Sequence, residues 1–423
     1  MKQDRPTIYR AAAVRDAQGT CARPGAVAVK HGRVVASGHP DSLPKRLVKN
    51  ATFIDRPGEL ILPSLVNAHA HLDLSPLGPR PYGGDFTAWL REVISLRPTE
   101  PKQIIEAVRA GLRLSRASGV GHLGDIAGST AAVMGRRQAP REVVVPGVSY
   151  LECFGLGGHQ ASTIARVQQA LEDLPFETRI DFHDRGAVLG LAPHAPYSTG
   201  LDVYKAANRL SQERIYRLTT HLAETQQELR FVSEADGPFA ELLKDLGKWD
   251  DSITPAGQHP VEWLEPVLKH ARWLLAHCNY VEDEHIDILQ KTGTSVVYCP
   301  IASEYFGHVD HRYRDMIDAG VNVCLGTDSI LCQPTSEPQP FGILPQMRRL
   351  YRRDQTEPGL LLKMATTHGM LALEISENDA TLQKRAPAVF AAVKIDPDDP
   401  LDPLVQVLMN DHPVTPIDAT REG

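Results

Sequence analysis

The chain has 423 residues, a formal net charge of −7 at neutral pH and a hydrophobic fraction of 42%. A chain of this length and composition is globular and forms either one large barrel with an appendage or two to three domains. The negative charge argues against a nucleic-acid surface, and no apolar run approaches the roughly 20 residues that span a bilayer. We expect neither nucleic acid nor a membrane as a partner. The basic pairs Arg348-Arg349 and Arg352-Arg353 recur at helical spacing and predict one solvated helix face.

Cysteine usage and the N-terminus indicate the compartment. The six cysteines are scattered without a C-x-x-C pair, and Met1 to Pro6 is not followed by the apolar core of a signal peptide. Four of the cysteines lie in or beside apolar strand candidates, where a free thiol behaves as a small hydrophobe. We therefore expect a reduced, cytoplasmic protein.

Both ends of the chain are rich in strand patterns. Residues 26–30 and 34–38 flank His31-Gly32-Arg33, which predicts a hairpin, and residues 388–395 form another strand candidate before an Asp/Pro-rich turn. Two strand-rich ends around a different middle predict one small β-sandwich domain, built from residues 1–60 together with 375–423.

The middle of the chain, residues 61–374, alternates apolar strand candidates with helical patterns such as 101–118, 202–214 and 282–291. Eight strands alternating with helices favour an α/β fold of the (β/α)8 TIM-like barrel type. An open doubly wound sheet is the competitor, but Gly155-Leu156-Gly157-Gly158 does not complete G-x-G-x-x-G. The strand candidates lie near 61–68, 120–126, 142–150, 187–193, 215–221, 272–277, 294–299 and 321–327.

The first barrel strand ends in Asn67-Ala68-His69-Ala70-His71. Side chains alternate along a strand, so His69 and His71 project to the same side. Two imidazoles at one point suggest a divalent metal and hydrolytic chemistry. An ordinary strand with two polar residues is the alternative.

Three further strand candidates end in residue types that often bind metals in proteins. His221 and then Glu224 follow the fifth strand, His277 ends the sixth, and Asp328 follows the eighth. A strand-end His is commonly only hydrogen-bonded, and an Asp after Gly-Thr often caps the next helix. In a barrel, however, the carboxyl ends of all strands open onto one mouth, so four strands that bring such residues together favour a metal site.

This set resembles the amidohydrolase superfamily: H-x-H after strand one, H-x-x-E after strand five, His after strand six and Asp after strand eight. A closer likeness is to S-adenosylhomocysteine/methylthioadenosine deaminases, aminodeoxyfutalosine deaminases and triazine-type chlorohydrolases. Dinuclear members of the superfamily bridge two metals with a carboxylated Lys on strand four, and residues 187–193 contain no Lys. The resemblance therefore implies one metal ion. The segments that carry the closer likeness are 63–69, 192–197, 221–225 and 325–329.

The resemblance also implies a role for each of these residues. The metal ligands would be His69, His71, His221 and Asp328, and the catalytic residues Glu224, His277 and Asp328. Asp328 would take a proton from the water at the metal, and His277 would orient that water. Glu224 would protonate a ring nitrogen and then assist the departing ammonia. Zinc is the default metal, with iron and manganese left open.

Substrate contacts are implied for His194, Trp89 and Ser303. The ordinary alternatives are a loop His beside prolines and an aromatic residue of a helix core. Ile301 stands where the futalosine-type relatives commonly have Arg, so the exact substrate stays open. The expected substrate is a small heterocycle, nucleoside-like or otherwise, that loses an amine by hydrolysis of a non-peptide C–N bond. Hydrolysis of a cyclic amide or of a ring C–X bond, and a non-catalytic barrel scaffold, are the alternatives. A homodimer is an expectation from such families alone.

Overall fold

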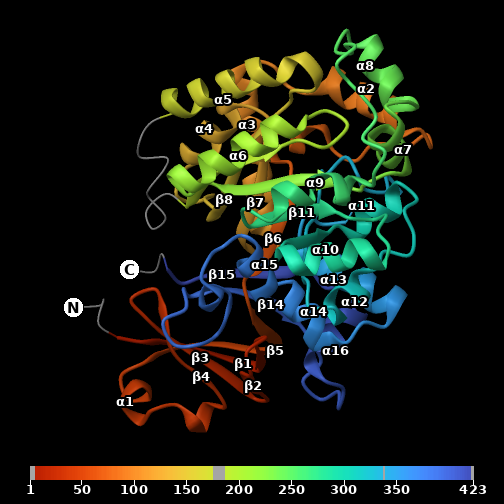
Figure 1. Ribbon diagram of the computed structural model, residues 1–423. Coiled ribbons are helices and arrows are strands. Elements are labelled where there is room, and N and C mark those ends of the chain that lie inside the picture. The colour runs from red at the N-terminus through yellow and green to blue at the C-terminus, as the bar shows by residue number, and fades with distance from the viewer. Residues whose placement is uncertain (1–4, 175–185, 337–338, 421–423) are drawn as a thin grey trace. The chain divides into compact units, whose positions relative to one another are not determined.

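The computed structural model describes residues 5–174, 186–336 and 339–420 (Figure 1). The chain divides into two compact units. One contains Met1–Ala68, Arg113–Leu123 and Pro340–Gly423, and the other contains His69–Leu112 and Gly124–Gln339. The sequence predicts domain boundaries after residue 60 and before residue 375. These boundaries follow strand patterns, whereas the two units are defined by compactness, so the predicted boundaries stay a prediction.

Eight strands form one sheet in the order β13-β12-β11-β10-β9-β8-β7-β6, so each strand neighbours the next in sequence. Where a register is defined, from β8 to β13, the pairing is parallel. The amides of Thr327 and Asp328 donate to the His69 carbonyl at 3.0 and 3.1 Å, and Ala70 forms a parallel bridge with Asp328. The first and last strands therefore meet, and the predicted barrel is confirmed. The strands are β6 (Leu65–Ala70), β7 (Val120–Ala127), β8 (Gly147–Cys153), β9 (Ala187–Pro193), β10 (Arg217–Leu222), β11 (Trp273–His277), β12 (Ser295–Tyr298) and β13 (Asn322–Leu325).

The barrel strands are largely buried because parallel strands are covered on both faces. Every residue of β7 and of β8 is buried. The third strand begins at Gly147 rather than near residue 142, since Pro146 has no amide hydrogen for the ladder. Helices separate the strands, as Figure 1 shows. They are α2 (Phe86–Leu96), α3 (Pro101–Ala117), α4 (Thr130–Arg137), α5 (Gln160–Asp173), α6 (Leu201–Arg214), α7 (Gln226–Glu234), α8 (Pro238–Asp245), α9 (Pro260–Leu268), α10 (Asp283–Thr292), α11 (Pro300–Tyr305) and α12 (Tyr313–Asp318).

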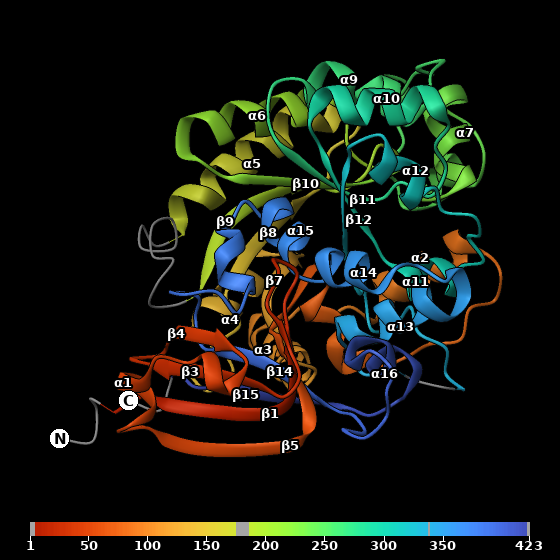
Figure 2. The same cartoon turned by 90° about the horizontal axis from the view of Figure 1, so that it is seen from below.

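A second sheet uses strands from both ends of the chain, in the order β15-β14-β5-β1-β3-β4, with β2 beside β1 (Figure 2). The predicted hairpin is β3 with β4, and His31 and Gly32 turn it with φ of 52° and 68°, the positive values of a type I′ turn. The prediction of a small sheet domain from both termini is confirmed. Its strands are β1 (Thr7–Arg15), β2 (Cys21–Ala22), β3 (Gly25–Lys30), β4 (Arg33–Gly38), β5 (Thr52–Pro63), β14 (Val389–Lys394) and β15 (Val414–Asp418).

The basic helix face predicted around residues 348–353 is only partly solvated. It lies on α13 (Ile343–Asp354), but Arg348 is buried and donates to the carbonyls of Val407 and His412 at 3.0 and 2.8 Å. The prediction was wrong for Arg348 because spacing shows which residues share a face, and not what packs on that face. The remaining helices are α1 (Lys45–Val48), α14 (Pro358–Met364), α15 (Thr367–Ala372) and α16 (Pro403–Met409).

Across the described ranges, no helix combines the length and the hydropathy that crossing a membrane requires. All six cysteines are free thiols, and only Cys21 is exposed.

Candidate active site

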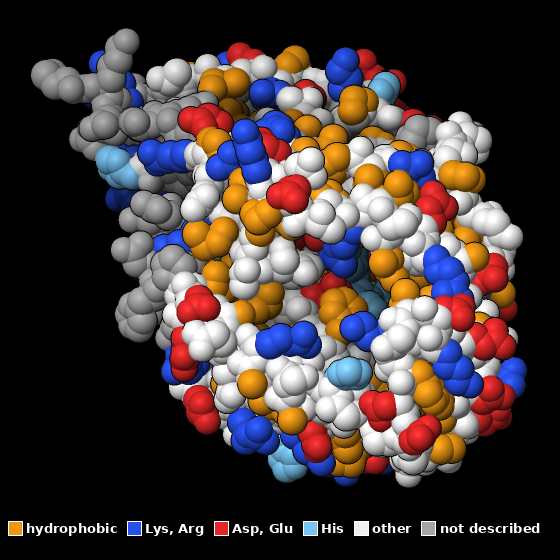
Figure 3. Space-filling model, turned by 90° about the horizontal axis from the view of Figure 1, so that it is seen from above, with side chains coloured by type: hydrophobic (Ala, Val, Ile, Leu, Met, Phe, Trp, Pro, Cys, Tyr) orange, Lys and Arg blue, Asp and Glu red, His pale blue; other side chains and the backbone are white. Residues whose placement is uncertain are grey.

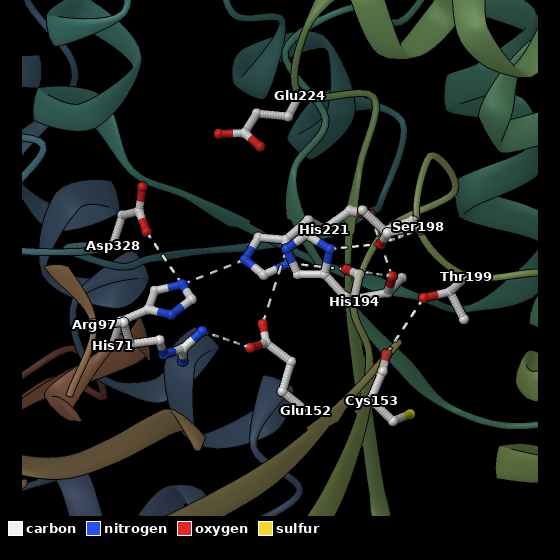
Figure 4. Close-up of polar contacts among 12 residues, drawn as sticks. His71, Arg97, Glu152, Cys153, His194, Ser198, Thr199, His221, Glu224 and Asp328 are labelled. Atoms are coloured by element: carbon white, nitrogen blue, oxygen red, sulfur yellow. Dashed lines mark hydrogen bonds and ion pairs between the residues drawn. The ribbon is translucent and has the colours of Figure 1, made fainter. Parts of the chain in front are cut away.

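The rings of His69, His71 and His221 and the carboxylate of Asp328 lie close together at the carboxyl end of the barrel. Figure 4 shows His71, His221 and Asp328 of this group. Nε2 of His71 lies 3.4 Å from Nε2 of His221 and 3.4 Å from Oδ1 of Asp328. Nε2 of His69 lies 3.7 Å from the same Asp328 oxygen. Ligands about 2.1 Å from a tetrahedral metal lie about 3.4 Å from one another. The spacing of these four residues therefore fits one divalent cation.

Strained backbone carries several residues of this end of the barrel. His277 ends β11 with φ of 75°, Asp328 follows β13 with φ of 56°, and Ala223 follows β10 with φ of 50°. Residues with a Cβ adopt this left-handed region at a cost of roughly 1–2 kcal/mol each. Such strain persists where the surroundings enforce it, and it clusters at functional sites.

His71 and His221 are held as neutral metal-type ligands. Nδ1 of His221 donates to the His194 carbonyl at 2.9 Å, which leaves the Nε2 lone pair directed at His71. Burial lowers the pKa of His221 to about 4 and the pKa of His71 well below its ordinary value. Nε2 of His277 is buried without a hydrogen-bond partner in the described chain. A buried ring nitrogen without a partner is costly, and a water or polar ligand group bound beside it would remove that cost.

Asp328 and Glu224 are buried carboxyls with opposite pKa shifts. Burial raises the pKa of Asp328, but its polar contact with His69 at 3.7 Å and the positive charges that His71 and His277 acquire in acid outweigh burial and hold that pKa well below its usual range. Burial and then the charge of Asp328 raise the pKa of Glu224 well above its usual range. Asp328 is therefore ionised at neutral pH, and Glu224 holds its proton to a higher pH than an ordinary carboxyl does. Two carboxyls driven apart in this way are typical of an acid and base pair.

The Glu224 carboxyl faces the histidines. Its Oε1 lies 3.6 Å from Nε2 of His277, and Figure 4 shows Glu224 and Glu152 on opposite sides of the histidine rings. A protonated carboxyl in this position can donate to a ligand held beside the rings.

The loop that carries Glu224 is fixed by residues that sequence reasoning missed. Both oxygens of the Glu228 carboxylate accept backbone amides, from Ala223 at 2.8 Å and from Glu224 at 2.9 Å. Asn279 donates to the Glu224 carbonyl at 3.0 Å and accepts from the Ser303 hydroxyl, also at 3.0 Å. The sequence signal for Glu228 was Thr225-x-x-Glu228, a pattern that usually marks only the start of a helix.

A second missed group lies beside His194. Arg97 donates to Asp73 at 2.9 Å and to Glu152 at 3.3 Å, and the other oxygen of Glu152 lies 3.9 Å from Nε2 of His194. A Cβ on Gly128 would lie 1.9 Å from the Arg97 guanidinium, so only glycine leaves room for it. These residues come from separate segments, and no motif in the sequence joins them.

The metal-type ligands open into a cavity of about 670 Å³ (Figure 3). Of the predicted substrate contacts, His194 and Trp89 line it, while Ser303 is not among its lining residues. Nδ1 of His194 lies 2.6 Å from the Ser198 hydroxyl, and the Trp89 ring packs at 4.9 Å from the ring of Phe306. The substrate roles of all three residues stay predictions.

Comparison with known proteins shows a family match and a shared fold. The sequence model of the amidohydrolase family matches residues 60–417. A 5-methylthioadenosine/S-adenosylhomocysteine deaminase of Clostridium tetani is 26% identical over 336 residues, which are 77% of this chain and 70% of the relative. The crystal structure of Helicobacter pylori aminofutalosine deaminase with methylthio-coformycin matches 96% of this chain and 97% of its own, with a TM-score of 0.79 and 20% identity. Zinc-complexed atrazine chlorohydrolase of Arthrobacter aurescens matches 95% and 91%, with a TM-score of 0.74 and 20% identity. The two structural matches show that the fold is common to all three proteins.

Proposed function

The chain belongs to the amidohydrolase family, and from this premise we propose that it is a metal-dependent aminohydrolase that releases ammonia from a nucleoside-like or other N-heterocyclic substrate. The observation that carries the proposal is the convergence of a histidine cluster and an ionised Asp328 beside Glu224, a buried carboxyl with a raised pKa. The deaminase names of the curated relatives support the same reaction.

We assign one divalent metal ion to His69, His71, His221 and Asp328. Three imidazoles and one carboxylate suit zinc, and the two 3.4 Å spacings from His71 support that coordination. Iron and manganese accept the same donors, so a metal analysis must choose among them. A divalent cation bound here would lower the pKa of water from 15.7 to about 7 and supply a nucleophile at neutral pH.

The protein side chains would move the protons. Asp328, ionised, accepts a proton from the attacking water, and Nε2 of His277 hydrogen-bonds that water and orients it. Glu224 enters the reaction protonated, donates to a ring nitrogen of the substrate, and so makes the neighbouring carbon more electrophilic. Glu224, now ionised, takes the proton of the newly bonded hydroxyl group and passes it to the departing amine, which leaves as ammonia, and Asp328 then returns its proton to Glu224. His194 and Trp89 would contact the heterocycle from the wall of the cavity.

The substitution Glu224→Gln tests this mechanism. It keeps the shape of the side chain but removes the transferable proton, so ammonia release should fall by a factor of about 10² to 10⁴. Bound metal, measured by elemental analysis, should stay equal to that of the wild type. Glu234→Gln, the same change at the exposed end of α7, is the matched control. Wild-type turnover in Glu224→Gln would remove Glu224 from the mechanism. The substrate screen covers adenosine-like, futalosine-like, pterin and triazine amines.

A second reaction has support from the structural match to an atrazine chlorohydrolase. Hydrolysis of a ring C–X bond needs the same activated water and the same protonation of a ring nitrogen. Chloride release from a chlorotriazine, with no ammonia from any amine, would favour this reaction. A purified protein that neither contains nor takes up metal would favour a non-catalytic scaffold. The free thiols support a reducing, cytoplasmic location, and a homodimer stays a prediction.

A further inference from the structure

The cavity of the candidate active site extends well beyond the metal-type ligands, along one side of α2. Phe86, Trp89, Leu90, Val93 and Ile94 all line it. Their spacing is that of a single helical stripe, the kind of face that a helix normally buries against a protein core. Phe86 and Val93 are already buried by the protein, but Trp89 and Leu90 are only partly buried and Ile94 is exposed. The surface that would cover these three side chains belongs to whatever fills the cavity.

The opposite walls are apolar as well. Leu242 and Leu243 of α8, and Val167 and Ala170 of α5, line the same cavity. The acidic side chains that line it (Glu152, Glu224 and Asp328) belong to the group around the histidines. The cavity is therefore polar at the strand ends and hydrophobic between α2, α5 and α8.

Exposed hydrophobic side chains gather at this cavity. Ile94, Phe154 and Leu246 are 53%, 44% and 42% exposed, and all three line it. They come from three separate segments of the chain. Exposed apolar residues that occur singly need no explanation, but a group that rims one cavity marks a binding surface. Figure 3 shows hydrophobic side chains at the hollow on this face.

We propose that the substrate is an amine-bearing heterocycle with a flexible hydrophobic tail of several carbon atoms. The ring lies at the histidines, and the tail lies between α2, α5 and α8. This inference rests on the proposed deamination, because that reaction puts the ring at the polar end. A cavity of about 670 Å³ is in the range that encloses a drug-sized molecule rather than a lone bicyclic ring.

Besides Arg97, which pairs with Asp73 and Glu152, two basic side chains line the outer part of the cavity and suggest a different ligand for that part. Arg166 and Lys248 are both exposed, and the Arg166 guanidinium donates to the Thr163 hydroxyl at 2.8 Å. Long basic side chains cover apolar surface with their methylene stems while the charge stays in water. They therefore extend the hydrophobic wall, and a charged-tail analogue tests whether the charges matter more.

The experiment uses two series of amines, 5′-alkylthio-5′-deoxyadenosines and N-alkyl aminotriazines, with tails from methyl to octyl. Ammonia release gives kcat/KM, and calorimetry with the Glu224→Gln protein gives Kd without turnover. Each added methylene should improve both quantities about fourfold until the cavity is full. Leu246→Ser should flatten this dependence, whereas Leu401→Ser, a change at 45% exposure elsewhere, should preserve it.

The outcomes separate this inference from the proposed function. Binding that improves with tail length without ammonia release contradicts the deamination alone. Ammonia release that does not depend on tail length, or failure of every member to bind, overturns the hydrophobic tail. A carboxylate-ended tail that binds tenfold better than the alkyl tail of equal length also overturns it, since the basic rim would then set specificity.

Discussion

Glu228→Gln should lower turnover although Glu228 does not line the cavity. The wild-type carboxylate accepts the amides of Ala223 and Glu224, at 2.8 and 2.9 Å, with one oxygen for each. Glutamine keeps one oxygen and presents an NH2 group to the other amide, so one charge-assisted bond is lost. Such a bond contributes about 1.5–3 kcal/mol. Ala223 also has φ of 50°, a strained conformation that the two bonds help to hold.

If loss of this bond weakens the contact of Glu224 with the transition state but not with the bound substrate, kcat should fall about 10- to 100-fold, since 1.4 kcal/mol is a factor of ten. KM should change little, and bound metal should match that of the wild type. Steady-state kinetics and elemental analysis measure these quantities. Glu234→Gln, on the same helix, loses only a solvent-screened, exposed ion pair with Arg230 and should leave kcat unchanged.

A double substitution distinguishes positioning from a general loss of stability. If Glu228 acts through Glu224, the double variant Glu224→Gln/Glu228→Gln should be no slower than Glu224→Gln, because both changes remove one function. Multiplied losses would show independent effects. A Glu228→Gln protein with wild-type kcat and lowered resistance to denaturant would refute the reasoning, because Glu228 would then be only a structural residue.

Three further outcomes are expected. Chelation of the metal should lower the Tm by a few degrees, and added Zn²⁺ should restore it. A ligand that binds the native state and is present at 100 times its Kd stabilises the folded protein by about 2.7 kcal/mol. An unchanged Tm argues against a bound metal. Burial raises the pKa of Asp125 from 3.8 to about 7. The folded state therefore binds this proton more tightly than the unfolded state, which stabilises the fold fully below pH 4, and the stabilisation is lost as the pH rises through 7. Asp125→Asn should therefore gain stability relative to the wild type, by up to about 4 kcal/mol, between pH 5 and pH 8 in denaturant titrations; parallel pH profiles would contradict this. Gly128→Ala should disrupt the Arg97–Asp73 pair and lower stability, whereas Gly83→Ala, where a Cβ meets nothing within 4 Å, should be neutral.

Several features were predictable because they depend on local order in the chain. Alternation along a strand places His69 and His71 on one side of it. An apolar run predicts a buried parallel strand even when the strand that pairs with it is unknown. The carboxyl ends of barrel strands share one mouth, so His221, His277 and Asp328 could be grouped before any distance was known. The eight-stranded barrel and the sheet built from both chain ends followed from the same patterns.

The contacts that position these residues left no such pattern. Glu228 looked like a helix-capping residue, yet its carboxylate binds the two amides that hold Glu224 in place. Arg97 joins Asp73 and Glu152 from segments 24 and 55 residues away, and Arg348 is buried on a face that spacing alone marks as solvated. Long-range pairing depends on which surfaces meet, and a single sequence records only its own periodicity.

The sequence by itself determined which donor atoms gather at the barrel mouth, because strand alternation and strand order are local properties of the chain. Only the tertiary structure decided the protonation of those groups and the shape of the space before them. Burial raises the pKa of Glu224 and lowers that of His221 because desolvation depends on everything packed around a charge. The hydrophobic cavity between α2, α5 and α8 likewise exists only once three separate helices enclose it.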